Sequence, residues 1–563
     1  MKKTKRIAAM FTAAVLFAAA VSGCSDGRGG RSQNDLTPEK AAETLDALLT
    51  KVSVTELPAE MDLEGIVSGD LASELPEISA FEKSVQGSGA IDVEIFASTE
   101  KGVRSDSGKN IDGWMVDAAE KFNAEGFDIG GNTVSVSIRP VASGTASDYI
   151  ISGKYIPQGF TPSNVLWTNL IEAKGVSLEL VEERLAGNTA GILMSEKRYN
   201  DFTGKYGDVT LQNLSQAVLA GDLLLGYTNP YTSSTGLNML VHMLSSFDET
   251  NPLSDTAKEQ LEKMQKNIPP VSYTTTQMRE TAEKGLLDSM VMEYQSYINI
   301  PDLKSYKFIP FGLRHDNPMY ATSSCTPEQK EALKMFTDYC LRDDIQQLAK
   351  DVGFNENEDF GGSGLSMSGD EITSAQSIWK EKKDAGQPIV AVFITDVSGS
   401  MEGTPISELK TSLLNASQYI GEDNYIGLVS YNSDVYMNLP IDKFTNTHRA
   451  SFNGAVKSLS ALGGTATYDA VLVGAKMLMD KKAEIPNAKL MMFLLSDGEQ
   501  IDGYNYDKIS PVIGGLHIPV HTICYGEELD EMKKLSQLNE ASSIQAMPED
   551  VVYNLKNMFN AQM

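Results

Sequence analysis

The chain has 563 residues, of which 41% are hydrophobic and 22% are charged, and its formal net charge is −29. This length exceeds one ordinary hydrophobic core and predicts two large domains with connecting segments. A chain this acidic repels phosphate backbones, which argues against nucleic acid as a partner, and no apolar run after the first two dozen residues is long enough to span a bilayer.

Residues 1–23 have the pattern of a secretory signal, with a basic start, an apolar run from Ile7 to Val21 and small residues before Cys24. The segment VSGC that ends at Cys24 resembles the lipobox of bacterial lipoproteins, in which the cysteine is acylated and becomes the new N-terminus. Acyl chains anchor a protein without a spanning helix. We therefore expect an extracytoplasmic lipoprotein that is held at the cell membrane through lipid on Cys24 alone.

Residues 24–90 are acidic and poor in aromatic side chains, and they are predicted to form a tether with one short helix near residues 38–50. From the segment AIDVEIFAS at residue 90 the pattern changes to strands that alternate with helical stretches. Such alternation is typical of α/β folds and predicts a domain over residues 91–353.

Three strand-to-helix turns in this first domain carry hydroxyl side chains, at residues 98–99, 143–145 and 231–235. Backbone N–H groups at a helix N-terminus attract anions, so the three turns together indicate a site for a small solute. Helix capping by Ser and Thr is the ordinary explanation for any one of these turns taken alone.

The segment TNPYTSSTG, residues 228–236, is similar to the Asn-Pro-x-x-Ser-x-Thr-Gly segment of bacterial extracellular solute-binding proteins, which are two-lobed periplasmic-binding-protein-like receptors. The resemblance implies that AGILMSEKRYNDF, from residue 190, opens the second lobe and that the chain crosses back near residue 290. It also implies a cleft for a small polar or anionic solute. The ligand contacts expected on this basis are Ser98, Thr99, Ser143, Thr145, Trp167, Ser233, Ser234, Thr235, Glu293 and Gln295.

Residues 354–386 are rich in Gly, Ser and acidic side chains and are predicted to be an interdomain linker. A second α/β series fills residues 387–563 and begins with PIVAVFITD, a continuous apolar run typical of a central parallel strand. The carboxyl end of such a strand is where α/β sheets bind ligands, and Asp396, Ser398 and Ser400 follow there. Oxygen side chains without nitrogen or sulfur suit a hard cation such as Mg²⁺.

Two further turns offer oxygen side chains, because Thr465 follows a Gly pair at a helix start and Asp497 ends another apolar strand. In order and spacing, the three turns resemble the metal-ion-dependent adhesion site of von Willebrand factor type A domains. The resemblance implies one Mg²⁺ or Mn²⁺ ion, bound directly by Ser398 and Ser400. Thr465 would bind it directly or through water, and Asp396 and Asp497 largely through waters. A carboxylate from a partner protein would fill the remaining position.

The expected fold class is therefore α/β: a two-lobed periplasmic-binding-protein-like domain followed by a doubly wound, Rossmann-like type A domain. We expect a cell-surface lipoprotein that couples solute binding to metal-dependent protein binding. Two alternatives stay open. The chain is the solute receptor of an ABC-type transporter with the second domain as a docking module, or it is an adhesion or assembly factor whose first domain is a scaffold. No nucleophile, acid–base pair or catalytic metal set supports an enzyme.

Cysteine and histidine add few constraints. With Cys24 assigned to lipid, Cys325, Cys340 and Cys524 remain, which permits at most one internal disulfide. Cys325 with Cys340 is the plausible pair, and whether it forms is left open. The five histidines are scattered along the chain, so a zinc cluster is not supported.

Overall fold

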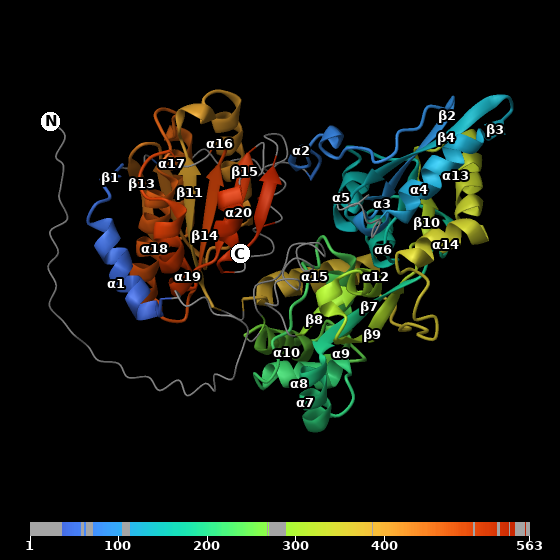
Figure 1. The fold of residues 1–563 in the computed structure, drawn as a ribbon, viewed down its shortest axis with the longest axis horizontal. Coiled ribbons are helices and arrows are strands. Elements are labelled where there is room, and N and C mark those ends of the chain that lie inside the picture. Colours follow the sequence, from blue (N-terminus) through green and yellow to red (C-terminus); the bar gives the residue numbers. More distant parts are fainter. Residues whose placement is uncertain are drawn as a thin grey trace.

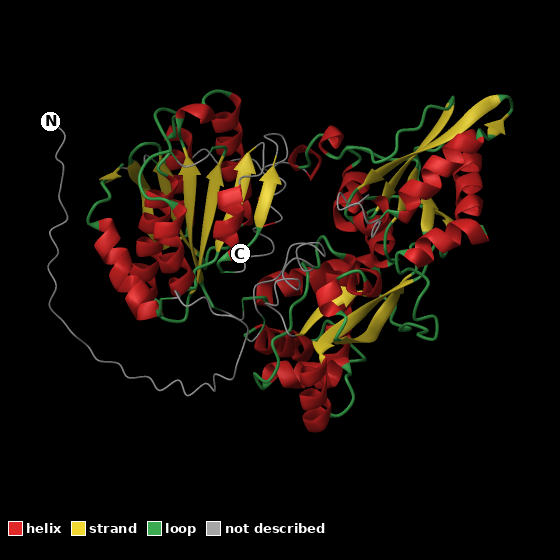
Figure 2. Cartoon of the chain, viewed as in Figure 1, coloured by secondary structure: helices red, strands yellow, loops and turns green. Residues whose placement is uncertain are grey.

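The computed structural model describes residues 36–57, 61–62, 71–103, 113–266, 268, 289–384, 387–498, 501–525, 530–539, 541–546, 555 and 558. Within these residues the strands form a seven-stranded sheet, a six-stranded sheet and a three-stranded sheet. We call the parts built on the six-stranded and three-stranded sheets lobe 1 and lobe 2, and the part built on the seven-stranded sheet the C-terminal module (Figures 1 and 2). Helices cover the sheets in all three parts, so the α/β fold class is confirmed.

Lobe 1 is built on the strand order β3-β4-β2-β5-β10-β6. Its central strand β2 runs parallel to β4 and β5, while β10 runs antiparallel to β5 and β6. Its strands are β2 (Ile91–Ala97), β3 (Asp128–Ile129), β4 (Asn132–Pro140), β5 (Gly159–Thr161), β6 (Glu179–Glu182) and β10 (Met319–Ala321). Its helices are α2 (Leu71–Glu74), α3 (Thr99–Gly102), α4 (Trp114–Glu125), α5 (Ser143–Ser152), α6 (Leu166–Ala173), α13 (Pro327–Cys340) and α14 (Asp343–Asp351).

Lobe 2 has β7 at the centre of its sheet, antiparallel to both β8 and β9. Its strands are β7 (Asn188–Ser195), β8 (Ser289–Glu293) and β9 (Tyr306–His315). Its helices are α7 (Glu196–Tyr206), α8 (Leu211–Leu219), α9 (Ser234–Phe247), α10 (Asp255–Gln265) and α12 (Tyr294–Ile298). The second lobe does open with β7, as predicted. The prediction of a return near residue 290 is wrong, because β8 pairs with β7 and the chain returns to lobe 1 only between β9 and β10.

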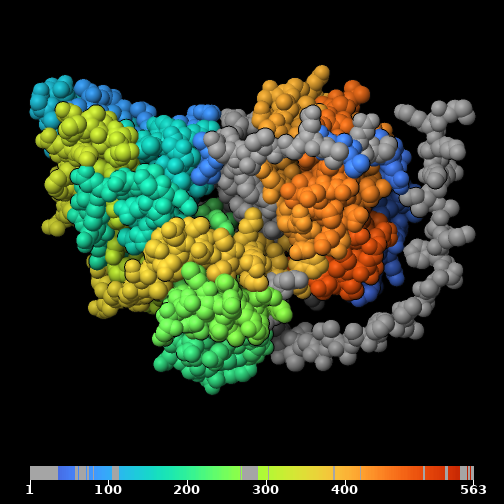
Figure 3. Space-filling model, turned by 180° about the vertical axis from the view of Figure 1, so that it is seen from behind, coloured from blue at the N-terminus to red at the C-terminus, as the bar shows by residue number. Residues whose placement is uncertain are grey.

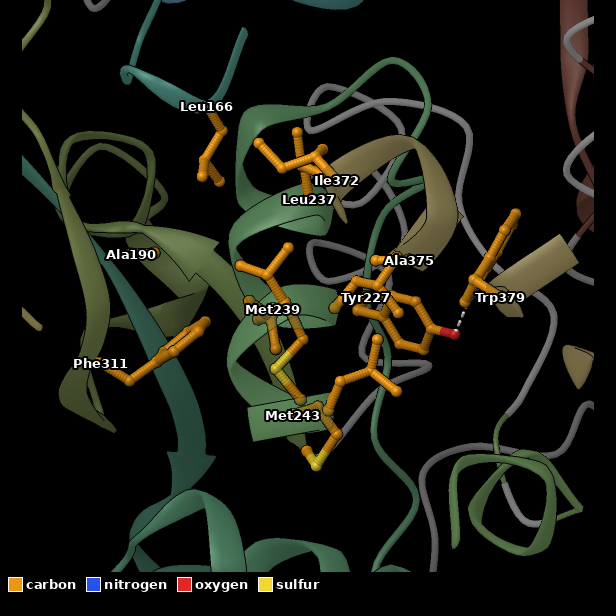
Figure 4. Packing of buried hydrophobic residues seen from close by; sticks show 14 of the residues in the cluster. Leu166, Ala190, Tyr227, Leu237, Met239, Met243, Phe311, Ile372, Ala375 and Trp379 are labelled. Atoms are coloured by element: carbon orange, nitrogen blue, oxygen red, sulfur yellow. Dashed lines mark hydrogen bonds between the residues drawn. The ribbon is translucent and has the colours of Figure 1, made fainter. Parts of the chain in front are cut away.

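Helix α15 (Gly369–Lys382) corrects the prediction of a linker over residues 354–386. It begins with a capping box between Ser368 and Glu371, and it packs on α6 of lobe 1 and on α9 and α10 of lobe 2. Figure 4 shows Ile372 and Ala375 among the apolar side chains of α9, and Trp379 Nε1 donates a hydrogen bond of 2.6 Å to Tyr227 Oη. These contacts make α15 a structural part of both lobes. The prediction missed the helix because the Gly- and Ser-rich residues before it dominate the composition of residues 354–386.

The C-terminal module has the strand order β1-β13-β12-β11-β14-β15-β16. All eight residues of β11 are buried; Ile389, Ala391 and Phe393 enter one hydrophobic core, and the residues between them enter a second core on the opposite face. This is a doubly wound sheet. Its strands include β11 (Ile389–Asp396), β12 (Tyr425–Tyr431), β13 (Val435–Lys443), β14 (Lys489–Ser496), β15 (Val520–Tyr525) and β16 (Ser543–Ala546). Its helices include α16 (Thr404–Ala416), α17 (Asn446–Ser458), α18 (Thr467–Glu484), α19 (Tyr506–Leu516) and α20 (Asp530–Gln537).

The N-terminal segment completes the C-terminal module, which corrects the prediction of a tether over residues 24–90. The helix expected near residues 38–50 is present as α1 (Pro38–Leu49), and its Ala41, Leu45 and Leu48 are buried against α18 and α19. Strand β1 (Val54–Glu56) then pairs in parallel with β13. The space-filling view shows this blue segment against the orange and red atoms of the module (Figure 3). The helix docks because its apolar residues recur at helical spacing and form one face. The acidic composition of the whole segment did not indicate this face.

The described residues from 71 to 103 belong to lobe 1. Leu75 is buried in a core of the lobes, and Arg139 Nη1 donates a hydrogen bond of 3.1 Å to the carbonyl oxygen of Ile78. Both lobes are therefore inserted between β1 and β11 of the C-terminal module. No described helix has the length and apolar character needed to cross a membrane. Cys325, Cys340 and Cys524 are free thiols, so the pairing left open above is not present.

We predict that Leu45→Ala destabilises the C-terminal module by about 2 to 4 kcal/mol, because it leaves a cavity under α1. Leu45 is 1% exposed, whereas Glu43 on the same helix is exposed, so Glu43→Ala is the matched control. All three tryptophans lie in the lobes. Urea unfolding followed by far-ultraviolet circular dichroism should therefore shift for Leu45→Ala, while the tryptophan fluorescence transition stays in place. Equal unfolding curves for the two variants would contradict the docking of α1.

Candidate functional sites

The first candidate site lies where β11 ends, at the carboxyl edge of the seven-stranded sheet. The backbone N–H of Ser398 donates to Asp396 Oδ1 at 2.8 Å, which folds the chain back over the strand end. The hydroxyl oxygens of Ser398 and Ser400 are 3.0 Å apart, and Ser400 Oγ donates to Asp497 Oδ1 at 2.8 Å. The structure thus brings four of the five metal-site residues predicted from the sequence into one chain of contacts.

The loop that carries Thr465 borders this site through backbone hydrogen bonds of two earlier residues. The N–H of Gly399 donates to the carbonyl oxygen of Gly463 at 2.9 Å, and the N–H of Leu462 donates to that of Val397 at 2.8 Å. Gly463 has φ of 92°, a conformation that favours glycine and lets this loop approach the first turn closely. Thr465 is 3% exposed and stands two positions after Gly463, in the loop that borders Gly399.

Asp396 is the most buried member of the site. Its side chain is 0% exposed, and Oδ2 accepts hydrogen bonds from Ser496 Oγ and, at 3.3 Å, from Tyr431 Oη. Burial raises the pKa of Asp396, and the nearby Asp497 carboxylate adds to this effect. Ser496 and Tyr431 were not predicted from the sequence. Ser496 directly precedes Asp497, which was an available signal, whereas Tyr431 reaches Asp396 only because β12 lies beside β11.

These residues fit a hard divalent cation. Every donor is an oxygen, two of the side chains are carboxylates, and burial raises the pKa of Asp497 as it does that of Asp396. A cation would offset the cost of ionising both groups in this partly desolvated place. No described cluster of three or more His, Cys, Asp or Glu side chains could hold a metal, so a centre here depends on serine and threonine hydroxyls as well.

The second candidate site lies between the lobes. Trp167 Nε1 on α6 donates to Ser234 Oγ on α9 at 2.8 Å, and Thr235 Oγ1 donates to Glu293 Oε1 at 3.2 Å. The two lobes approach so closely that a Cβ on Gly144 would lie 2.3 Å from the carbonyl oxygen of Tyr231. The lobes are therefore closed on one another, with these polar side chains at their contact.

The other predicted contacts surround this meeting point. Ser98 Oγ donates to Glu100 Oε1, and Ser143 Oγ accepts from the N–H of Ser163 at 3.3 Å. The N–H of Gln295 donates to Asn188 Oδ1 at 3.3 Å. Ser233 caps α9, Thr145 is buried in the first turn of α5, and Thr99 is exposed.

Sequence reasoning predicted Glu293 but missed two other charged members of this site, Glu100 and Lys101. Lys101 is 0% exposed; its Nζ donates to Ser98 Oγ and, at 2.8 Å, to Asn317 Oδ1. Burial lowers the pKa of Lys101 to about 8, although the carboxylates of Glu100 and Glu293 act in the opposite direction. Asn164, Asn188 and His315 were also missed. Asn164 donates a hydrogen bond to the carbonyl oxygen of Ser234, and both Asn188 and His315 are hydrogen-bonded to the carboxylate of Glu293.

Two features could have pointed to these residues. Lys101 stands three positions after Ser98 in the turn that follows β2, and His315 with Asn317 occupies the crossing between β9 and β10. The sequence did not indicate this crossing, because the return was expected near residue 290. The described site thus holds Glu100 next to Lys101, and Glu293 next to His315.

Residues 391–562 match the family model of the von Willebrand factor type A domain. A Synechocystis sp. protein named only as uncharacterized is 25% identical over 197 residues, and the match covers 34% of this chain and 43% of that protein. The chain thus spans less than half the length of this curated relative.

Solved structures are similar to both halves. The von Willebrand factor type A protein from Catenulispora acidiphila has 22% identity and a TM-score of 0.29, covering 31% of this chain and 42% of that one. A periplasmic thiamin binding protein has 13% identity and a TM-score of 0.38, covering 54% of this chain and 98% of that one. From the family model, the chain contains a von Willebrand factor type A domain at residues 391–562.

Proposed function

We propose that this chain is a cell-surface lipoprotein that couples a solute-binding-like part, formed by the two lobes, to Mg²⁺-dependent protein binding by the type A domain. The observation that carries the proposal is the contact chain from Asp396 through Ser398 and Ser400 to Asp497 at the end of β11. Mg²⁺ or Mn²⁺ would be held there by these four residues and Thr465. The bound ion would supply a coordination position for a carboxylate oxygen of a partner protein.

The chain's own residues prepare this position. The hydroxyl groups of Tyr431 and Ser496 donate hydrogen bonds to Asp396 Oδ2, and the backbone N–H of Ser398 donates one to Asp396 Oδ1. Ser400 is exposed, so the side of the site that carries its hydroxyl faces solvent and is accessible to another protein. With only two carboxylates in the site, a divalent ion keeps an attraction for a third.

Coupling between the two parts is supported by α15. This helix contacts α6 of lobe 1 as well as α9 and α10 of lobe 2, so a change in the angle between the lobes must move it relative to at least one of them. It ends at Lys382, and β11 begins at Ile389. Lys489 Nζ at the start of β14 lies 3.4 Å from Asp384 Oδ1 in this short connection. We propose that this connection passes a movement of the lobes to β11, the strand whose far end is Asp396.

The alternative, a solute receptor of an ABC-type transporter, is supported by the same polar contacts between the lobes. Both functions require that the lobes bind a small polar or anionic solute. The two functions differ in the role of the type A domain. In a transport receptor, this domain would dock the chain to a neighbouring protein.

The metal centre predicts that Ser400→Ala weakens Mg²⁺ binding at least tenfold. The side chain is exposed, so the free energy of unfolding should change by less than about 1 kcal/mol. Calorimetric titration of the full-length chain with MgCl₂ measures the first quantity, and urea unfolding in EDTA measures the second. Ser407→Ala, on the exposed face of α16, is the control and should bind Mg²⁺ as the native chain does. Native affinity in the Ser400→Ala chain would remove this residue from the centre.

The interlobe site predicts that a bound solute raises the melting temperature of the lobes. A ligand present at ten times its dissociation constant stabilises the folded state by about 1.4 kcal/mol. Oxyanions, carboxylates, sugar phosphates and amino acids should be screened, with Trp167 fluorescence as a second signal because its indole N–H bonds across the lobes. A Trp167→Phe chain gives the background of the other two tryptophans. Absence of any melting or fluorescence change would support the scaffold role instead.

Lipidation predicts that Cys24→Ser moves the protein from the membrane fraction to the soluble fraction. Cys24 lies outside the described residues, and acylation of its thiol is the only attachment the proposal provides. Labelling with a fatty-acid analogue should mark the native chain and leave the variant unmarked. A variant that still sediments with membranes, together with an unlabelled native chain, would rule out the anchor.

A further inference from the structure

A buried histidine lies where the chain crosses from lobe 2 to lobe 1. His315 is the last residue of β9, and its side chain is 0% exposed. Its Nδ1 lies 2.7 Å from Glu293 Oε1, so this nitrogen carries a proton and donates it to the carboxylate. Its Nε2 lies 3.1 Å from the side-chain nitrogen of Asn164 and 3.1 Å from that of Asn238. The ring thus has a carboxylate on one side and two amide groups on the other.

The orientation of both amides is fixed by their other hydrogen bonds. Asn164 Oδ1 accepts from the N–H of Leu166 at 3.1 Å, and Asn238 Oδ1 accepts from the N–H of Leu313 at 3.0 Å. Asn238 Nδ2 also donates to the carbonyl oxygen of Leu313 at 2.8 Å. Both amides therefore present N–H groups to Nε2, which accepts with its lone pair. In the closed lobes, His315 is the neutral imidazole with its proton on Nδ1.

A second proton on the ring would point at these two N–H groups. Donors that face each other repel, and a buried donor without an acceptor costs free energy. Asn238 and Glu293 belong to lobe 2, as His315 does, so their effect on the ring is the same at any angle between the lobes. Asn164 belongs to lobe 1, and its Nδ2 also donates to the carbonyl oxygen of Ser234 on α9 at 3.4 Å. The protonated ring is therefore accommodated better when lobe 1 has moved away.

The charges that lobe 1 brings act in the same direction. Lys101 is 0% exposed and interacts electrostatically with Glu293, so closure places a buried cation beside the carboxylate that His315 contacts. Glu100 offsets part of this charge, with its Oε1 3.8 Å from Lys101 Nζ. Closure thus adds one N–H donor and one cation to the surroundings of the ring, and both oppose a second positive charge there.

Three further titratable or charged groups lie near the ring. Arg314 and Asp316 flank it in the chain and are paired with each other, Nε to Oδ1, at 3.0 Å. His242 on α9 lies against the same asparagine, with Nδ1 2.9 Å from the carbonyl oxygen of Asn238. Burial lowers the pKa of His242, and the charge of a protonated His315 lowers it further. His242 therefore takes up its second proton at lower pH than an ordinary histidine.

We propose that His315 is a proton-operated latch, which keeps the two lobes closed while Nε2 is unprotonated and lets them open when the ring takes up a second proton from solvent. The open state holds one proton more than the closed state, so the ratio of closed to open chains should fall by up to about tenfold for each unit that the pH is lowered. Histidine ordinarily changes charge between about pH 5 and pH 8, which places the latch in the physiological range. The latch belongs to the lobes alone and does not depend on the metal centre.

Small-angle X-ray scattering and tryptophan fluorescence of the full-length chain in EDTA, from about pH 8 to about pH 5, test the latch. In acid the radius of gyration should rise, and the fluorescence should change with the same midpoint, because Trp167 Nε1 bonds to Ser234 Oγ across the lobes. Far-ultraviolet circular dichroism should stay constant. A native chain without this transition, or one whose circular dichroism is lost at the same midpoint, would overturn the proposal.

Two histidine variants are the controls. His517→Asn removes an exposed histidine of the C-terminal module at φ of 54°, a conformation that asparagine tolerates, and it should keep the native transition. His242→Gln should keep it as well. Loss of the transition in either control would assign the proton to that residue and overturn the latch at His315.

Two latch variants should act in different ways. The side chain in His315→Gln can accept from both amides but takes up no proton, so this chain should stay closed over the whole range. Asn164→Asp replaces an N–H group with a carboxylate oxygen, to which a protonated Nε2 can donate, so acid should close this chain further and the pH dependence should change sign. An Asn164→Asp chain that opens in acid as the native chain does would overturn the proposal, and this result decides alone if His315→Gln does not fold.

Discussion

The pairing of β11 with its two neighbours is the constraint on which the rest of the C-terminal module depends. β11 runs parallel to β12 and β14, and the register places Thr395 opposite Ser430 on one side and Leu495 on the other. Because the three strands run in the same direction, their ends meet at one edge, and Tyr431 and Ser496 fall beside Asp396. A slip by one residue would exchange side chains between the two cores and move Asp396 away from Tyr431 and Ser496, so this register also fixes the metal-site geometry.

Local patterns in the sequence were enough to predict the strands and the residues at their ends. The apolar runs of β11, β14 and β15 are long, and hydroxyl or acidic residues follow the first two directly. Contacts that depend on register were not predictable in this way, as Tyr431 and Lys101 show. Nor were the docking of α1 and the existence of α15, since average composition over a long acidic or Gly-rich segment conceals three or four apolar residues at helical spacing. Whether such apolar residues are buried depends on the surface that the helix covers, which the local sequence does not show.

The interlobe site differs from the metal site in how it treats charge. Between the lobes, Glu293, Lys101 and His315 are buried, Glu100 is partly buried, and all four are hydrogen-bonded to one another or to amide and hydroxyl groups. Such a network is costly to desolvate and holds its members in fixed positions once it is satisfied. At the end of β11 the carboxylates face each other across serine hydroxyls and have no such cationic partner among the contacts described, which is the arrangement that a metal ion can complete.

The insertion of the lobes between β1 and β11 has a practical consequence for protein production. A gene fragment that starts at residue 387 would encode a sheet whose β13 lacks β1 and whose α18 and α19 lack the cover of Ala41, Leu45 and Leu48. An uncovered strand edge beside an apolar patch invites aggregation. A fragment designed the other way, with residues 36–57 joined to residue 387 by a flexible Gly/Ser segment, would keep the module's own first helix and strand and dispense with the lobes.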